Sequence, residues 1–122
     1  MFNNTMKNNN TRQIGDAGES LVCDKLEQKG FEILHRNYRV VTGEIDIIAK
    51  DHDTLCFIEV RTRENIRLGH PAETVSKHKI RTIRRTAEFY LAQKKIRSVP
   101  IRFDVATIIW ESGKYEYFSN AF

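Results

Sequence analysis

The spacing of apolar and polar residues divides the chain into helical and extended segments. Apolar residues that recur every three or four positions predict a helix over about residues 13–29, ended by Gly30, and a longer helix from Pro71 to about Lys95. Alternating apolar and polar residues predict strands, which lie at about 31–40, 44–50, 55–62, 101–109 and 115–118. The predicted order is αβββαβ followed by a terminal strand. Because the second helix joins two strands as a crossover, we expect a mixed sheet with some parallel pairing.

The strands at 44–50 and 55–62 are predicted to form a hairpin with a single register. Their polar connection, Asp51-His52-Asp53-Thr54, has the composition of a hairpin loop. Closing that loop pairs Lys50 with Leu55, Ile48 with Phe57 and Asp46 with Glu59. Strict alternation then places Glu44, Asp46 and Ile48 on one face of their strand and Ile45, Ile47 and Ala49 on the other.

Asp46 and Glu59 are the candidate chemical centre of this hairpin, with Glu44 and Arg61 expected in the same patch. Two carboxylates directly opposite each other repel unless something neutralises them. Mg²⁺ does so with one or two carboxylates together with substrate phosphate oxygens. Asp, then about a dozen residues later Glu-x-basic on the neighbouring strand, favours phosphodiester hydrolysis. The pattern leaves open the plainer alternative of an amphipathic hairpin whose charges face water.

Length and composition indicate one globular domain. The 122 residues suit a single domain, and we expect it to span 13–122 after a disordered, Asn-rich leader over 1–12. Apolar runs fall short of the roughly 20 residues that cross a bilayer, so no membrane partner is expected. Two cysteines without metal-binding spacing, and no secretory signal, predict a reducing cytoplasm.

The charge is spread unevenly and points to a polyanionic partner. The net charge is +4, but residues 61–102 alone carry +9, whereas 1–60 carry −3 and 103–122 carry −2. A cationic stretch of this size attracts nucleic-acid phosphates. The candidate phosphate-binding residues are Arg63, Lys77, Arg81, Arg84 and Arg85. The alternative is a solvated basic helix face, and charge alone does not decide between the two.

Several motifs along the chain share a recognisable pattern: Gly15-Asp16-Ala17-Gly18-Glu19, Arg36-Asn37-Tyr38-Arg39, Gly43-Glu44-Ile45-Asp46-Ile47-Ile48-Ala49 and Phe57-Ile58-Glu59-Val60-Arg61-Thr62-Arg63, with Lys79 and Arg102-Phe103-Asp104-Val105 further on. Together they resemble the YraN-like family of uncharacterised bacterial proteins, which belongs to the restriction-endonuclease-like superfamily. The resemblance covers nearly all of residues 12–110. It implies an α/β fold with an αβββαβ core, in which a central mixed sheet is flanked by helices. The analogues of known activity that the chain looks like are archaeal Holliday-junction resolvases.

The resemblance also implies roles for the acidic residues. Asp46 and Glu59 would be the main metal ligands, and Glu19 matches the first-helix carboxylate of the same site. The alternative for Glu19 is a solvated residue in the first helical turn, where a carboxylate favours the helix dipole. Glu44 belongs to the motif without an assigned role.

One position departs from the superfamily pattern, which usually has Lys where this chain has Arg61. Arginine stays protonated and cannot be a general base, but it can hold a scissile phosphate in a bidentate grip. Lys79 lies on the apolar stripe of the second helix and is the candidate to supply an ammonium instead. Its alternative role is a stem that packs along the edge of the core.

These expectations describe a Mg²⁺- or Mn²⁺-dependent endonuclease that acts on DNA, with branched DNA and a homodimer suggested by the resolvase analogy. The expected catalytic residues are Asp46, Glu59, Arg61, Lys79 and Glu19. The alternative is a catalytically inactive nucleic-acid-binding or adaptor domain on the same fold, which the presence of Arg61 keeps open. Asp104 is expected in a salt bridge with Arg102 rather than in the metal site, and Cys23 and Cys56 as small core residues.

Overall fold

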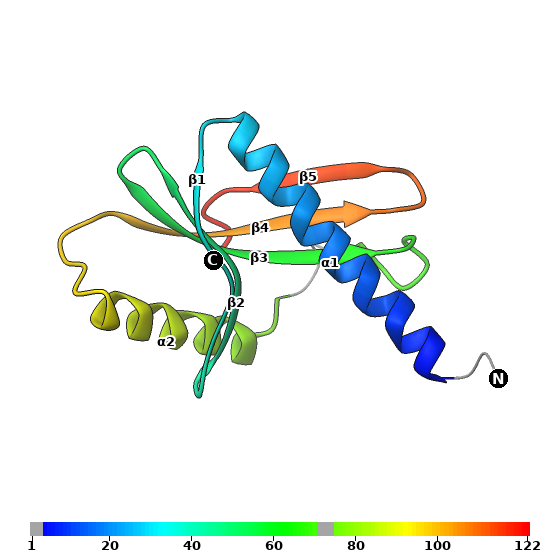
Figure 1. Cartoon of the computed structure of the whole chain (residues 1–122), viewed down its shortest axis with the longest axis horizontal. Coiled ribbons are helices and arrows are strands. Elements are labelled where there is room, and N and C mark those ends of the chain that lie inside the picture. The colour runs from blue at the N-terminus through cyan, green and yellow to red at the C-terminus, as the bar shows by residue number, and fades with distance from the viewer. Residues whose placement is uncertain (1–3, 71–74) are drawn as a thin grey trace.

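The chain folds into a five-stranded mixed sheet with a helix on each face (Figure 1). The computed structural model describes residues 4–70 and 75–122, with side chains from Gly15 onward. The elements are α1 (Asn4–Gln28), β1 (Glu32–Val40), β2 (Gly43–Asp51), β3 (Thr54–Arg63), α2 (Lys77–Gln93), β4 (Ile101–Ile109) and β5 (Lys114–Phe118). The sheet order is β1-β2-β3-β4-β5, and β3 pairs with β4 in parallel. The predicted αβββαβ core and mixed sheet are therefore confirmed.

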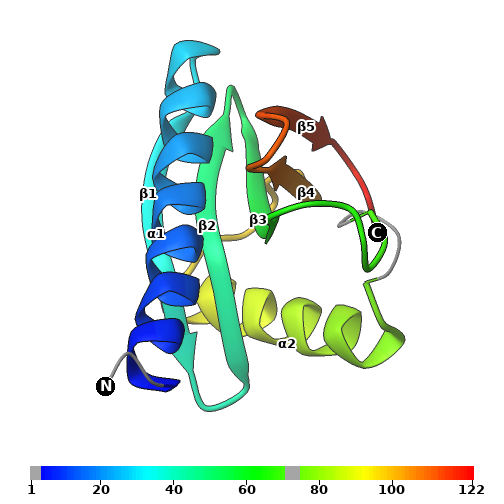
Figure 2. The ribbon, with the colours of Figure 1, turned by 90° about the vertical axis from the view of Figure 1, so that its right-hand side faces the viewer.

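The two helices bury opposite faces of the sheet. Val22 and Leu26 of α1 belong to the cluster that contains Ile47 and Ile58, together with the buried Cys23 and Cys56. Ile83, Ala87 and Tyr90 of α2 belong to a second cluster with Ile48, Phe57 and Phe103. In Figure 2, α1 runs alongside β1 and β2, while α2 lies crosswise to it. Among the described residues, no helix is long and apolar enough to cross a membrane.

The hairpin of β2 and β3 has the predicted register. Ile48 pairs with Phe57 and Lys50 with Leu55. The turn is tighter than expected because Asp51 and Thr54 also pair, which leaves only His52 and Asp53 between the strands. The ladder ends at the pair Ile47–Ile58. Asp46 and Glu59 therefore face each other one step beyond the last regular pair.

The predicted face of Ile45 is wrong, because the alternation of β2 breaks at Asp46. Ile45 packs with Tyr38 and Ile48 on the side of α2, whereas Ile47 packs on the side of α1. The neighbouring strand is irregular at the same place: Asn37, which lies opposite this break, has a left-handed φ of 52°. A left-handed residue turns the local backbone and so re-aims the side chains around it. Asp46 thus lies where the strand changes the face that it presents.

Both helix starts differ from the sequence predictions. Helix α1 begins at Asn4, so residues 4–12 of the expected leader are helical. This stretch contains neither Pro nor Gly, so nothing in it stops the helix from extending upstream. Helix α2 begins at Lys77 instead of Pro71, since Ser76 is extended and caps the helix. The expected helical residues 71–74 lie outside the described residues.

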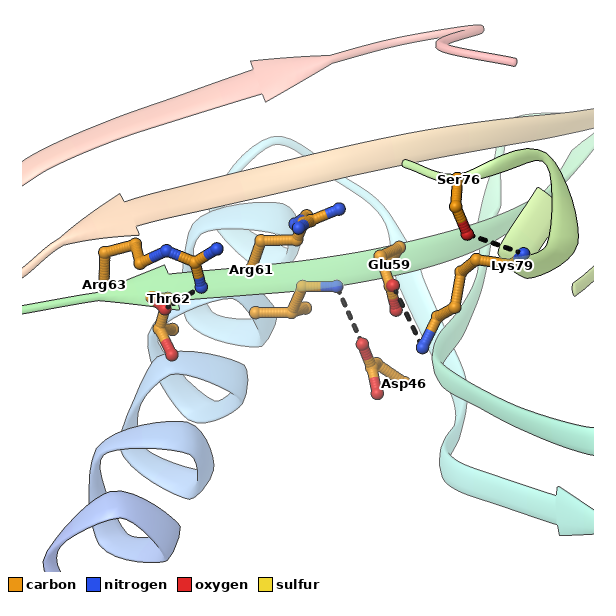
Figure 3. A pocket seen from close by; sticks show the side chains of 8 residues that line it. Asp46, Glu59, Arg61, Thr62, Arg63, Ser76 and Lys79 are labelled. Carbon is orange, nitrogen blue, oxygen red and sulfur yellow. Dashed lines mark hydrogen bonds and ion pairs between the residues drawn. The ribbon is translucent and has the colours of Figure 1, made fainter. Parts of the chain in front are cut away.

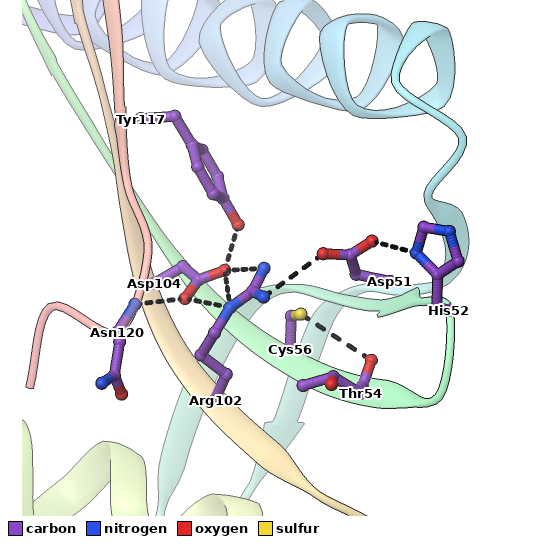
Figure 4. Close-up of polar contacts among 8 residues, drawn as sticks. All are labelled: Asp51, His52, Thr54, Cys56, Arg102, Asp104, Tyr117 and Asn120. Atoms are coloured by element: carbon purple, nitrogen blue, oxygen red, sulfur yellow. Dashed lines mark hydrogen bonds and ion pairs between the residues drawn. The ribbon is translucent and has the colours of Figure 1, made fainter.

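A buried ion pair fastens β5 and the C-terminal segment to the sheet (Figure 4). Asp104 is fully buried and accepts hydrogen bonds from Arg102 Nε at 2.9 Å, from the Tyr117 hydroxyl and from the backbone N–H of Asn120 at 2.8 Å. Arg102 also reaches Asp51 at 3.2 Å. The predicted structural role of Asp104 is confirmed, since this carboxylate is fully used inside the fold.

Candidate functional site

A cavity of about 580 Å³ opens beside the hairpin and the start of α2. It is lined by Asp46, Glu59, Val60, Arg61, Thr62, Arg63, Ser76 and Lys79. Strand β2 supplies Asp46, strand β3 supplies the run from Glu59 to Arg63, and α2 supplies Lys79 (Figure 3). The structure therefore brings four of the predicted catalytic residues, Asp46, Glu59, Arg61 and Lys79, to one cavity.

Asp46 and Glu59 form the acidic end of this cavity. Glu59 is only 9% exposed, and the backbone N–H of Val60 donates to Asp46 Oδ2 at 2.8 Å. Burial, the hydrogen bond with Glu59 and the charge of Glu59 together raise the pKa of Asp46 to about 8. Near neutral pH the pair therefore retains a proton between its two carboxyl groups. The predicted juxtaposition is confirmed, and a cation that binds both carboxyl groups would take the place of this proton.

Lys79 reaches this pair from the first turn of α2. Its Nζ atom lies 3.3 Å from Glu59 Oε2, and its backbone N–H donates to the Ser76 hydroxyl at 3.1 Å. The side chain is 50% exposed, so its ammonium sits at the border between the carboxylates and the open cavity. The ion pair with Glu59 thus explains why a lysine, Lys79, occurs on the side of α2 that faces the sheet.

Arg61 and Arg63 form the basic end of the cavity. Both follow Glu59 along β3 at alternate positions, which places them on the same side of the strand. Arg63 Nη1 donates to the carbonyl of Thr62 at 3.4 Å. Ser76 also lines the cavity and was not anticipated. A serine just before a helix is a capping signal that could have identified it, but placing the helix start at Pro71 concealed the signal.

Glu19 and Glu44 do not line the cavity. Glu44 pairs with Arg39 on the neighbouring strand, so the expectation that it joins the acidic patch is wrong. Glu19 lies on α1, 3.9 Å from Arg36, and its Oε1 atom is buried without a hydrogen bond. Burial raises the pKa of Glu19, and its charge contributes to the raised pKa of Asp46. Within the described residues, no three His, Cys, Asp or Glu side chains are already grouped as a metal cage.

Most of the candidate phosphate-binding residues lie away from the cavity. Helix α2 buries Ile83, Ala87 and Tyr90, and Lys77, Arg81 and Arg85 fall on its opposite, exposed face. Arg84 is also exposed, and its guanidinium lies over the ring of Phe103 at 4.9 Å from the ring centre. Of this set, only Arg63 contacts the cavity. The basic helix face is thus a second surface, separate from the acidic pair.

The sequence model of the family described as Uncharacterised protein family UPF0102 matches residues 18–108. The chain belongs to this family. It is the YraN-like family that the motifs predicted, and the structure is consistent with its restriction-endonuclease-like core. UPF0102 proteins of Dictyoglomus thermophilum and Clostridioides difficile are 48% identical over 117 residues and 41% identical over 113, each covering 93% of this chain and 99% of the relative. One from Prosthecochloris aestuarii is 44% identical over 108 residues, covering 86% of this chain and 85% of the relative.

Proposed function

We propose that this UPF0102 protein is a metal-dependent endonuclease that hydrolyses phosphodiester bonds in DNA. The observation that carries the proposal is the juxtaposition of Asp46 and Glu59 in an open cavity that also holds Lys79 and two arginines. One lysine neutralises one carboxylate, so a purely structural ion pair has no use for the second. Ionising the half-buried Asp46 beside Glu59 is unfavourable, which is why its pKa is raised to about 8. A bound cation would offset this cost by stabilising both carboxylates.

The donor set suits Mg²⁺ or Mn²⁺. Both ions prefer oxygen ligands, and Mg²⁺ in particular is held by one or two carboxylates while substrate phosphates and water complete its coordination. Asp46 and Glu59 would hold the ion, and Glu19 adds negative charge from α1 behind them. When bound, the ion supplies Lewis acidity and lowers the pKa of a coordinated water.

The basic residues of the cavity act on the phosphate. Lys79 lies within reach of Glu59 and is half-exposed, so its ammonium can stabilise the charge that develops on the attacked phosphate. Arg61 cannot accept a proton, and its guanidinium instead holds a phosphate oxygen pair. Arg63 extends this contact along the DNA backbone. The exposed face of α2 with Lys77, Arg81 and Arg85 binds phosphates further from the cleaved bond.

The second candidate is a catalytically inactive nucleic-acid-binding or adaptor domain. The observation in its favour is the Lys79–Glu59 ion pair, because a lysine that permanently occupies Glu59 fills the metal position. The two candidates differ in a direct measurement. Calorimetric titration with Mn²⁺ gives one site that requires Asp46 and Glu59 if the protein is a nuclease, and no binding if the ion pair is permanent.

Cleavage assays test the nuclease directly. Wild-type protein with Mg²⁺ or Mn²⁺ is expected to cut DNA, and Glu59→Gln and Asp46→Asn are expected to abolish cutting while DNA binding remains. Asp53→Asn is the matched control, since Asp53 is an exposed carboxylate at the far turn of the same hairpin. Equal cutting by wild type and Glu59→Gln would remove the activity from this site. Binding of DNA without cutting of duplex, single-stranded or branched forms would support the adaptor.

The resolvase analogy extends the proposal to branched DNA and to a homodimer. Two strands are cut together only when two sites are presented at once, and a two-fold dimer provides them. Strand β5 is an edge of the sheet, and Phe118 at its end is 36% exposed, so this edge can pair with a second copy. Light scattering with and without a four-way junction is expected to show a dimer. A monomer in both conditions would end the analogy but not the metal site.

A further inference from the structure

A turn that follows the cavity strand holds two large apolar side chains in water. Ile66 is 60% exposed and Leu68 is 92% exposed, and the exposed Arg67 lies between them. Singly exposed apolar residues are common on protein surfaces. Two of them on one short projecting turn, flanking an arginine, form a feature that requires an explanation.

The turn is held in place by hydrogen bonds at its base and apex. The backbone N–H groups of Trp110 and Glu111 donate to the carbonyls of Arg63 and Glu64, at 2.9 and 2.8 Å, and so continue the pairing with β4. The Asn65 side chain accepts from the Arg67 N–H at 3.0 Å, and the Gly69 N–H donates to the Ile66 carbonyl at 3.0 Å. Gly69 has a φ of 101°, which closes the turn in a conformation that favours glycine.

The end of the turn is also anchored. His70 Nε2 lies 2.9 Å from Glu116 Oε1 on β5, so the segment is tied to the sheet on both sides of its apex. The exposure of Leu68 is therefore built into the fold rather than being the result of a loose loop. A side chain presented in this way is ready to bury its surface against a partner.

The turn lies beside the cavity. Arg63 lines the cavity, and Ile66 follows it by three residues, a span of at most about 10 Å of extended chain. That distance corresponds to only a few nucleotides along a DNA strand whose phosphate occupies the cavity. Arg61 and Arg63 line the cavity and the exposed Arg67 lies in the turn, so the stretch from 61 to 67 has three arginines against one acidic residue, Glu64. This positive balance suits a nucleic acid better than an apolar protein surface.

We infer that Leu68, supported by Ile66, is a wedge that inserts between bases close to the phosphate held in the cavity. Aliphatic side chains inserted at a base step unstack the bases and bend the duplex, and arginine beside such a wedge contacts the backbone or the groove. The inference rests on the proposed nuclease function and adds a specificity element to it. DNA whose stacking is already interrupted, by a nick or a gap, binds best because it needs no unstacking.

The test uses the full-length protein and three DNA duplexes of one sequence: continuous, nicked, and with a two-base gap. In EDTA, which prevents metal-dependent cutting, 2-aminopurine placed at successive positions reports unstacking by an increase in fluorescence. Wild type is expected to increase the fluorescence at one or two neighbouring positions of the continuous duplex. It is also expected to bind the gapped duplex about tenfold more tightly than the continuous one, because the gap makes the cost of unstacking unnecessary.

The Leu68→Ala variant is expected to lose both the fluorescence increase and the preference for the gap, and Leu68→Met to retain them. The matched control is Val99→Ala, since Val99 is also exposed and lies near Leu55, at the other end of β3. Because Leu68 is almost fully exposed, its substitution leaves folding intact, which thermal unfolding verifies. If Leu68→Ala shows the same fluorescence increase and the same preference for the gapped duplex as wild type, the wedge is overturned.

The wedge and the nuclease fail separately. A wild-type protein that cuts DNA through Glu59 with no influence of Leu68 would refute the wedge alone. A protein that never cuts, but unstacks bases through Leu68, would refute the nuclease and keep the wedge. Absence of binding to all three duplexes would refute the wedge, while cleavage assays on single-stranded and branched DNA would still decide the nuclease.

Discussion

The ammonium of Lys79 lies 3.3 Å from the carboxylate of Glu59 and joins the first turn of α2 to the middle of β3. The ammonium of Lys79 and any metal cation that enters the cavity therefore compete for the carboxylate of Glu59. Lys79 in turn is held where a phosphate bound in the cavity would contact it. The same contact therefore tunes metal affinity and positions a phosphate ligand.

Replacement of this lysine is expected to separate the two effects. In Lys79→Ala, Mn²⁺ binding measured by calorimetry should become several-fold tighter, because the ion no longer displaces an ammonium from Glu59. Cleavage should nevertheless fall about 100-fold in kcat, the usual effect of losing one group that stabilises transition-state charge. Lys50→Ala is the control, since Lys50 is an exposed lysine near the end of β2 that neither lines the cavity nor belongs to the basic face of α2. Weaker Mn²⁺ binding in Lys79→Ala would contradict the competition between lysine and metal.

The proton on Asp46 should make stability depend on pH. Its pKa is about 8 in the fold and 3.8 in an unfolded chain. Between these values the folded state holds a proton that the unfolded state has released, so the free energy of unfolding is expected to fall as the pH rises from about 4 to 8. Urea unfolding in EDTA at pH 5.5 and 8.5 measures this slope. Asp46→Asn should flatten it, whereas an equal slope in wild type and variant would place the effect elsewhere.

A metal ion should reverse this trend. The ion replaces the proton shared by Asp46 and Glu59, so its binding becomes tighter as the pH rises. The increase in Tm on adding Mn²⁺ is therefore expected to be larger at pH 8.5 than at pH 5.5. Asp46→Asn should lose most of that increase at both values. The same increase at both pH values would show that the ion binds without displacing a proton.

The exposed basic face of α2 should govern the salt dependence of DNA binding. Arg81→Ala with Arg85→Ala removes two charges from this face without touching the cavity or the contact between Arg84 and Phe103. Each phosphate contact contributes about −0.9 to the slope of log affinity against log salt. The double variant is thus expected to flatten the slope by nearly two, measured by fluorescence anisotropy. The matched double variant, Lys29→Ala with Lys50→Ala, should leave the salt slope unchanged. Equal slopes in all three proteins would show that the α2 face is solvated and does not contact DNA.

Gly18 permits a close approach of α1 to the cavity strand. A Cβ atom at this position would lie 2.3 Å from Thr62 Cγ2, whereas one at Gly15 of the same helix would meet nothing within 4 Å. Gly15→Ala is expected to stabilise the protein by about 0.5–1 kcal/mol through helix propensity. Gly18→Ala should destabilise it by about 1–3 kcal/mol because of overpacking. Denaturant unfolding measures both, and Thr62→Ser should rescue Gly18→Ala; a stabilised Gly18→Ala would disprove the close contact.

Local patterns along the chain were sufficient for the sheet and for its acidic pair. The period of two in β2 and β3, together with the polar turn at His52 and Asp53, allows one register, and Ile48 pairs with Phe57 as that register requires. The juxtaposition of Asp46 and Glu59 follows from it. The crossover helix likewise demanded the parallel pairing of β3 with β4. These features depend on neighbours in sequence and on backbone geometry, which a single chain displays.

The tertiary structure alone decided which other groups meet that pair. Ile45 left its expected face because β2 breaks its alternation at Asp46, opposite the left-handed Asn37, and periodicity cannot reveal such a break. Glu44 forms an ion pair with Arg39, and Glu19 on α1 lies beside Arg36. Both carboxylates are therefore paired with arginines of β1 instead of lining the cavity. The basic residues of α2 face the solvent because Ile83, Ala87 and Tyr90 on the opposite side of the helix pack into the core. Which way a polar side chain points is determined by packing between elements that are distant in sequence, and that information is absent from any local pattern.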